Sequence, residues 1–270
     1  MIQSRPIRPF GFAVPDKGLP IIRAALPEGS ALRGGVMVLG NFDGFHRGHL
    51  YLIRAAKRIA ADGRAVGVMS VEPHPRQLFR PADAPFRLAS VAQKHHQAAA
   101  IGLDFLYEPA FDAAFAVIQP IEFINDILGA TLGVSHIVVG ADFHFGAKRA
   151  GNAATLGAEC PPRGIGVTVL PLQAGYSSTA VRAAVAAGEI AQARNLLGRP
   201  WQAEVARGLC LARGQIRPPA GRYLIRAAAL SPVLLIDLDD EGRISGPQNL
   251  PARIDFLERR SSPFAYRSQP

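Results

Sequence analysis

Short apolar runs alternate with amphipathic stretches over most of the chain. The runs predict strands at residues 36–39, 65–71, 103–107, 136–139 and 167–170. The stretches between them predict helices at about 48–61, 90–101, 120–132 and 152–159, followed by a helical pair over about 178–197. Continuous apolar strands separated by helices indicate a parallel sheet that is covered on both faces. We therefore expect an α/β fold with a doubly wound, five-stranded, Rossmann-like parallel sheet.

The pattern is different on either side of this region. Residues 1–34 are rich in proline and glycine, and we expect a loose lead-in with a short helix around residues 21–25. After Trp201, short strands separated by Gly/Pro turns are expected at residues 204–211, 222–228, 233–238 and 253–257. The predicted domains are thus the lead-in 1–34, an α/β domain 35–201, and a small, incomplete β module with a frayed tail over 202–270.

Composition narrows the functional classes. Hydrophobic residues make up 49% of the 270, enough for a real core, and no apolar run reaches the roughly 18 residues of a membrane span. No secretory signal is evident, and Cys160 and Cys210 suggest no disulfide, so we expect a cytoplasmic protein that does not bind membranes. The net charge is +9, and 26 of the 30 basic residues are arginine, which suits phosphate unless these residues are only scattered over the surface. Nucleic acid is not expected, because there is no basic run and aromatic residues make up only 7%.

The first candidate site directly follows the first apolar run. A Gly-Asn-Phe-Asp-Gly turn over residues 40–44 leads to His46 and His49, with Gly48 between them, where a helix is expected to begin. A helix N-terminus attracts phosphate, and two histidines three residues apart can both donate to its oxygens. A purely structural cap and a zinc site remain alternatives. Arg47 argues against zinc, because it stands where the H-E-x-x-H zinc motif has glutamate.

The second candidate site follows the last predicted strand of the α/β domain. Ser177 or Ser178 can cap a helix, Thr179 lies in its first turn, and Arg182 comes one turn later. An isolated copy of this pattern would indicate only a capped helix with a surface arginine. Its pairing with the H-R-G-H turn makes a shared phosphate site the better interpretation.

Together, G-N-F-D-G-x-H-x-G-H and S-S-T-x-x-R resemble the H-x-G-H nucleotidyltransferase superfamily, and within it the FAD synthetase module of the bifunctional riboflavin kinase/FAD synthetases. Residues 71–76 (VEPHPR), 138–146 (VVGADFHFG) and 180–201 resemble further segments of that module. The resemblance covers about residues 35–201 and implies an enzyme that transfers AMP from ATP to FMN, giving FAD and pyrophosphate.

The resemblance also implies roles for individual residues. It gives catalytic roles to His46, His49 and Arg182, ATP binding to Gly40, Asn41, Gly48, Asp142, Ser177, Ser178 and Thr179, and FMN binding to His74 and Arg76. Mg²⁺ is expected to bridge phosphate oxygens, with few dedicated protein ligands. A structural role for His74 and a plain strand-end turn at Asp142 stay open. The histidines of Lys94-His95-His96 are expected at the surface or partly buried.

The chain departs from the bifunctional family after Pro200. The kinase signature G-R-x-L-G-F-P-T-A-N is missing, although residues 218–228 and 252–260 resemble strands of the kinase barrel. We therefore expect no riboflavin kinase activity, with FMN supplied by a separate kinase. Phe45 stands where the family commonly has valine. The rival hypotheses are a nucleotidyltransferase of the same fold with another acceptor or CTP, and a non-catalytic flavin- or nucleotide-binding protein.

Overall fold

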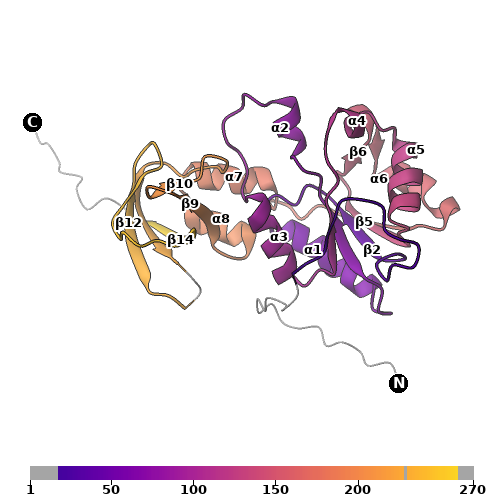
Figure 1. Cartoon of the computed structure of the whole chain (residues 1–270), viewed down its shortest axis with the longest axis horizontal. Helices are drawn as coiled ribbons and strands as arrows, with labels where there is room; N and C mark the ends of the chain where they lie inside the picture. The colour runs from indigo at the N-terminus through magenta and orange to yellow at the C-terminus, as the bar shows by residue number, and fades with distance from the viewer. Residues whose placement is uncertain (1–17, 228–229, 261–270) are drawn as a thin grey trace, which may run out of the picture. The chain divides into compact units, whose positions relative to one another are not determined.

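A computed structural model describes residues 18–227 and 230–260 (Figure 1). Half of the expected lead-in and nearly all of the expected frayed tail lie outside these residues. The chain forms two compact units. The first combines the residues up to Asp83 with Ala92–Ala174, and the second combines Ala84–Val91 with the residues from Gly175 onward. The division into domains at residues 35 and 201 stays a prediction.

The first unit is built on a six-stranded parallel sheet. Its spatial order is β1 (Ile21–Ile22), β4 (Phe105–Tyr107), β3 (Val66–Met69), β2 (Val36–Leu39), β5 (His136–Gly140) and β8 (Gly166–Leu170). All five predicted strands are present, so the doubly wound fold is confirmed. The sixth, β1, lies where we expected a short helix. That expectation is wrong because Ile21 and Ile22 pair with Leu106 and Tyr107 at the sheet edge, and this pairing overrides local propensity.

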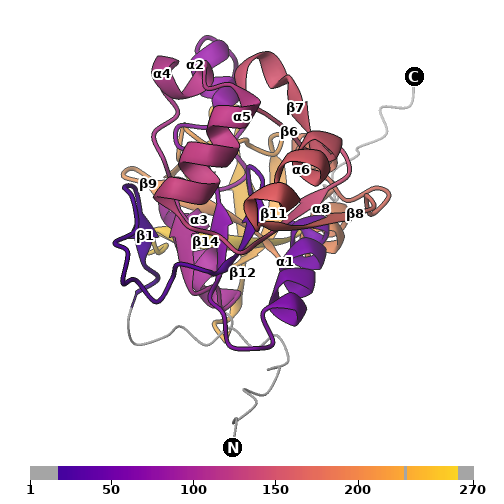
Figure 2. The same cartoon turned by 90° about the vertical axis from the view of Figure 1, so that its right-hand side faces the viewer.

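Helices cover both faces of this sheet. α1 (Arg47–Ile59) and α3 (Val91–Ala100) pack on one face. On the other face, η1 (Phe123–Thr131), which continues directly from α5 (Pro120–Glu122), packs together with α6 (Ala153–Glu159) (Figure 1). In Figure 2 the side with α5 and α6 faces the viewer. Alternate residues of β2 enter the two cores: Val36 and Val38 pack with α1, and Met37 and Leu39 pack with η1. Among the helices that the structure describes, none is both long and apolar enough to cross a membrane.

The strand order indicates which edge of the sheet is expected to bind a ligand. The chain runs outward from β2 through β3 to β4, then returns to β5 and β8 on the other side of β2. The order therefore reverses between β2 and β5, and ligands of such sheets bind beyond the carboxyl ends of the strands at this point. The loops at this edge comprise residues 40–46, 70–74 and 141–143.

The remaining short elements of the unit are α2 (Pro75–Phe79), α4 (Ala113–Ala116), β6 (His144–Phe145), η2 (Ala147–Arg149), β7 (Gly151–Asn152) and η3 (Pro161–Arg163).

The second unit joins a helix pair to a six-stranded antiparallel sheet. Its helices are α7 (Ser178–Ala186) and α8 (Ile190–Leu197), and its strands are β10 (Cys210–Leu211), β9 (Trp201–Ala206), β14 (Arg253–Arg260), β11 (Gly221–Arg226), β12 (Val233–Leu238) and β13 (Ile244–Ser245), in spatial order. The strand expected at 204–211 is interrupted. Gly208 and Leu209, with φ of 80° and 53°, form a turn that folds β10 back on β9.

Residues 84–91 precede α3 in the chain but belong to this second unit. The buried carbonyl of Leu88 accepts hydrogen bonds from Trp201 Nε1 and Gln215 Nε2, both at 3.1 Å. The carbonyl of Arg87 accepts from the Ile216 amide at 2.9 Å. Leu88 also joins the core formed by α7, α8 and the antiparallel sheet. The sequence pattern gave no sign of this association, because the segment is short and lacks periodicity.

Candidate active site

The turn that follows β2 is held by two buried aromatic rings. Phe42, Gly44 and Phe45 have φ of 47°, 85° and 42°. Residues other than glycine rarely adopt such values, and each one costs about 1–3 kcal/mol. The rings of Phe42 and Phe45 are fully buried and stack with centroids 5.4 Å apart. Their burial therefore offsets the backbone strain and keeps residues 40–46 in one shape.

His46 ends this turn and caps α1. Its Nδ1 accepts a hydrogen bond from the backbone amide of His49 at 3.4 Å, and the residue is 6% exposed. A neutral imidazole that accepts at one nitrogen carries its proton on the other. The Nε2 of His46 is therefore the ring nitrogen that can donate to an anion.

His49 stacks directly on His46, with ring centroids 3.7 Å apart and planes 22° apart, and it also contacts the ring of Phe42 at 4.9 Å. Burial, and secondly the neighbouring His46, hold the pKa of His49 well below its ordinary value of 6.5. His49 is thus neutral at neutral pH. Its Nδ1 is buried without a hydrogen-bond partner among the described residues. Because a buried N–H without an acceptor is the costlier arrangement, the proton of the ring belongs on Nε2.

The two histidines share their position with the N-terminus of α1. A helix leaves its first backbone amides without intrahelical partners and carries partial positive charge there. The first turn of α1, described in full, contains no acidic side chain. Two N–H-bearing imidazoles beside such a terminus can bind phosphate oxygens without a permanent charge on His49.

The loop that follows β3 carries His74 and Arg76, which we expected to bind FMN. His74 caps α2, and its Nδ1 accepts from the Arg76 amide at 3.2 Å. The Arg76 guanidinium pairs with Asp83 at 2.8 Å. Asp142, expected to bind ATP, is exposed in the turn after β5. The loops that carry these residues and the H-R-G-H turn follow the neighbouring strands β3, β2 and β5 and leave the same edge of the sheet.

The second motif lies in the second unit. Ser177 caps α7, its Oγ accepting from the Ala180 amide at 3.1 Å, so that Ser178 and Thr179 lie in the first turn. The Arg182 Nε donates to the Phe86 carbonyl at 2.9 Å, and its guanidinium lies 5.3 Å from the centre of the Phe86 ring. The two motifs thus belong to different units, and their convergence on one triphosphate stays a prediction.

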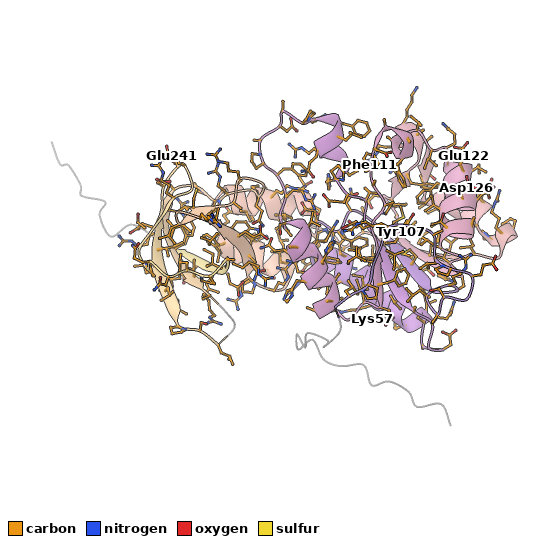
Figure 3. The ribbon with its side chains drawn as sticks, viewed as in Figure 1. Lys57, Tyr107, Phe111, Glu122, Asp126 and Glu241 are labelled. Carbon is orange, nitrogen blue, oxygen red and sulfur yellow. The ribbon has the colours of Figure 1, made fainter. Side chains whose placement is uncertain are left out.

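Two features of the first unit escaped sequence reasoning. Lys94, for which the sequence indicated no role, is 1% exposed. Its spacing from the buried Ala98, one helical turn away, was the available signal. The second feature is an aromatic cluster. Phe79 is 66% exposed, and its ring lies 5.8 Å from that of Phe111, which Figure 3 shows beyond Tyr107 on the side of α2. Phe111 in turn lies 5.9 Å from Phe115. The pattern of apolar residues along the sequence does not predict this cluster, because its members come from separate loops and short helices.

Comparisons with known proteins agree with this geometry. Residues 29–182 match the family model described as FAD synthetase. The chain is 38% identical over 219 residues to a bifunctional riboflavin kinase/FMN adenylyltransferase of Pseudomonas fluorescens, covering 78% of this chain and 70% of that one. It is 35% identical over 175 residues to an FAD synthetase of Listeria monocytogenes, covering 63% and 70%. The bifunctional enzyme of Escherichia coli K12 is 38% identical over 176 residues, and the match spans only 55% of its length.

A solved structure shares the fold. It is titled as a macrolide-efflux protein from Streptococcus pneumoniae, and it superposes with a TM-score of 0.74 over 90% of both chains. The sequence identity is 24%, so this likeness shows the architecture alone.

Proposed function

Because the chain belongs to the FAD synthetase family, we propose that it transfers the adenylyl group of ATP to FMN at the H-R-G-H turn. The family match confirms the expected module and its class, a nucleotidyltransferase. The observation that carries the site is the stacked pair of His46 and His49 at the start of α1, beyond the carboxyl end of β2. This is the position where an open parallel sheet binds its ligand.

The reaction makes demands that these residues meet. An oxygen of the FMN phosphate attacks the α-phosphorus of ATP, the bond to the bridging oxygen breaks, and that electron pair leaves with pyrophosphate. The protein need form no covalent intermediate, so catalysis consists of positioning and of stabilising charge on the transferring group. In this proposal the Nε2–H groups of His46 and His49 donate to the phosphate oxygens.

The remaining expected residues complete the proposed site. Gly40, Asn41 and Gly48 line the phosphates of ATP, and Asp142 borders its adenine or ribose. Arg182 holds the β- and γ-phosphates from α7, together with the hydroxyls of Ser177, Ser178 and Thr179. His74 and Arg76 lie near the flavin phosphate. The exposed ring of Phe79 offers a flat apolar surface on which the isoalloxazine can stack.

Mg²⁺ fits this site as a partner of the nucleotide. Among the described residues, no three carboxylate, histidine or cysteine groups gather where they could hold a metal ion. We propose that the triphosphate oxygens supply most of its ligands, and that the bound ion neutralises phosphate charge.

Cys160 and Cys210 are both free thiols, which supports the proposed cytoplasmic location.

We further propose that this chain does not phosphorylate riboflavin and that a separate kinase supplies FMN. The support is the sequence WQAEVARGLCLARG at residues 201–214, where the P-T-A-N motif is missing. Chromatography of the products of purified protein tests both proposals, with ATP and Mg²⁺ and either riboflavin or FMN. We expect FAD from FMN and no FMN from riboflavin. Absence of FAD from the reaction with FMN contradicts adenylyl transfer. Formation of FMN in the reaction with riboflavin contradicts the loss of kinase activity.

A further inference from the structure

A buried lysine of α3 connects the loops of the proposed active site. The Lys94 side chain is 1% exposed. Its Nζ lies 2.9 Å from Glu72 Oε2, 2.9 Å from Glu108 Oε2 and 3.4 Å from Ser70 Oγ. All three donor positions of the ammonium group are therefore directed at named oxygens.

Each partner of Lys94 lies just beyond the carboxyl end of a strand. Ser70 and Glu72 follow β3 and lead to His74, and Glu108 follows β4 directly. The Ser70 hydroxyl donates to the Asn41 carbonyl of the turn after β2, at 2.9 Å. Lys94 thus contacts residues that follow two neighbouring strands, β3 and β4, and through Ser70 it is linked to the turn after β2 that presents His46 and His49.

Backbone hydrogen bonds join the same loops. The Glu72 amide donates to the Pro109 carbonyl at 3.1 Å, and the Phe111 amide donates to the Glu72 carbonyl at 2.9 Å. The loop that carries His74 therefore runs beside the loop that carries Phe111. The Lys94–Glu72 and Lys94–Glu108 ion pairs hold these two loops together at the buried side chain of Lys94.

The charges of the network are balanced. Glu108 also accepts from Arg23 at 2.7 Å and contacts His95 Nε2 at 2.8 Å. Burial alone would raise the pKa of Glu108, but hydrogen bonds from His95, Lys94 and Arg23 and the charge of Lys94 outweigh it and hold that pKa below the ordinary value. Glu108 is therefore anionic and matched to Lys94. A buried charge that loses its partner is costly, so the arrangement is a single, well-defined one.

We propose that Lys94 is a positioning residue for adenylyl transfer: it sets the phosphate-binding turn at Asn41 and the loop carrying His74 in their reactive arrangement. This inference rests on the proposed function. Lys94 touches no substrate in this account, because it is buried beneath the loops. It acts through Ser70 on the turn after β2 and through Glu72 on the loop after β3. Misplacement of reacting groups by about 1 Å can cost about a hundredfold in rate.

Steady-state kinetics of Lys94→Met, Lys94→Arg and Ser70→Ala test this proposal. The matched control is Lys57→Met. Lys57 is another lysine of a covering helix, and its Nζ donates to the Ile101 carbonyl at 2.6 Å near the opposite, amino end of β4 (Figure 3). The folded fraction of each variant is measured by circular dichroism at the assay temperature. We expect kcat/KM for FMN to fall about 10- to 100-fold in Lys94→Met, with partial recovery in Lys94→Arg and no change in Lys57→Met.

The outcomes separate positioning from stability. If folded Lys94→Met keeps the wild-type kcat and KM, or if Lys94→Met and Lys57→Met lose activity only as they unfold, the proposal is wrong. If Lys94→Met does not fold, Ser70→Ala decides, since it keeps both ion pairs and removes only the hydroxyl that connects Lys94 to Asn41. A folded Ser70→Ala with unchanged kcat then overturns the proposal. Quenching of flavin fluorescence reports FMN binding without turnover. A wild-type chain that binds FMN but makes no FAD contradicts the proposed function, whereas unchanged FMN affinity together with unchanged kcat in folded Lys94→Met contradicts the role of Lys94.

Discussion

The rings of His46 and His49 lie stacked at the start of α1, with centroids 3.7 Å apart and planes 22° apart. Two like groups in such contact cannot both be charged at low cost, and the lowered pKa of His49 follows from its burial and from His46. The pair therefore offers N–H donors rather than two cations to a bound phosphate.

Replacement of His49 by alanine tests its role in the transition state. We expect kcat for FAD synthesis to fall about 10²- to 10³-fold in His49→Ala, as when a preorganised donor to developing charge is removed. The control is His96→Ala, because His96 is exposed on α3 and outside both motifs. Steady-state assays with purified variants check this. Equal kcat in His49→Ala and the wild type would remove His49 from the mechanism.

The stability of the chain should depend on pH through His49. The unfolded histidine titrates near 6.5, and the folded one titrates lower because of burial and His46. Below about pH 6.5 the unfolded chain therefore binds more protons, and the free energy of unfolding falls as the pH falls, by up to about 1.4 kcal/mol per pH unit. His49→Gln cannot titrate and should lose less stability than the wild type over this window. Urea unfolding at several pH values measures the difference, and parallel pH dependences would contradict the neutral, buried state of His49.

Much of the fold follows from the chain itself, and for identifiable reasons. The run Val36–Leu39 is fully buried on both faces, so its apolar continuity marks a central parallel strand without ambiguity. Local pattern fails at β1, where a two-residue edge strand is defined only by its pairing with β4. It also fails at residues 84–91, whose place in the second unit depends on hydrogen bonds to Trp201 and Gln215 far along the chain.

Some residues of the candidate site could likewise be predicted from local sequence, and others could not. The position of the H-R-G-H motif could be predicted from the sequence, because the strand, the turn and the start of the helix follow each other directly along the chain. Lys94 does not, since its partners Ser70, Glu72 and Glu108 come from loops that only the folded sheet brings together. A lysine is also the residue least expected inside a core unless carboxylates accompany it.

The rings beneath the phosphate turn should be essential for stability. Phe45 is 1% exposed and has φ of 42°. We expect Phe45→Val to lower the free energy of unfolding by about 2–4 kcal/mol, because it opens a cavity and places a β-branched residue in a left-handed conformation. Phe79→Val, at an exposed ring, should stay within about 0.5 kcal/mol of wild type. Chemical denaturation checks both, and similar losses at the two positions would contradict the assigned packing.

The exposed ring of Phe79 should contribute to flavin binding. Loss of one aromatic stacking contact costs about 0.5–1.5 kcal/mol, which corresponds to about a 2- to 10-fold rise in KM for FMN in Phe79→Ala. The KM for ATP should not change, because Phe79 lies on α2, whereas the proposed phosphate donors His46 and His49 lie at the start of α1. Initial rates with each substrate varied in turn separate the two constants. A rise in KM for ATP alone would place the flavin elsewhere.

The most direct test of adenylyl transfer at the H-R-G-H turn is a time course of FAD and pyrophosphate formation from FMN, ATP and Mg²⁺, run with the wild type, His46→Ala and His49→Ala. We predict that the wild type forms the two products in equal amounts and that both variants form them at least about a hundredfold more slowly. Pyrophosphate without FAD, or FAD formed at the wild-type rate by both variants, would contradict the assignment of this turn as the reaction centre.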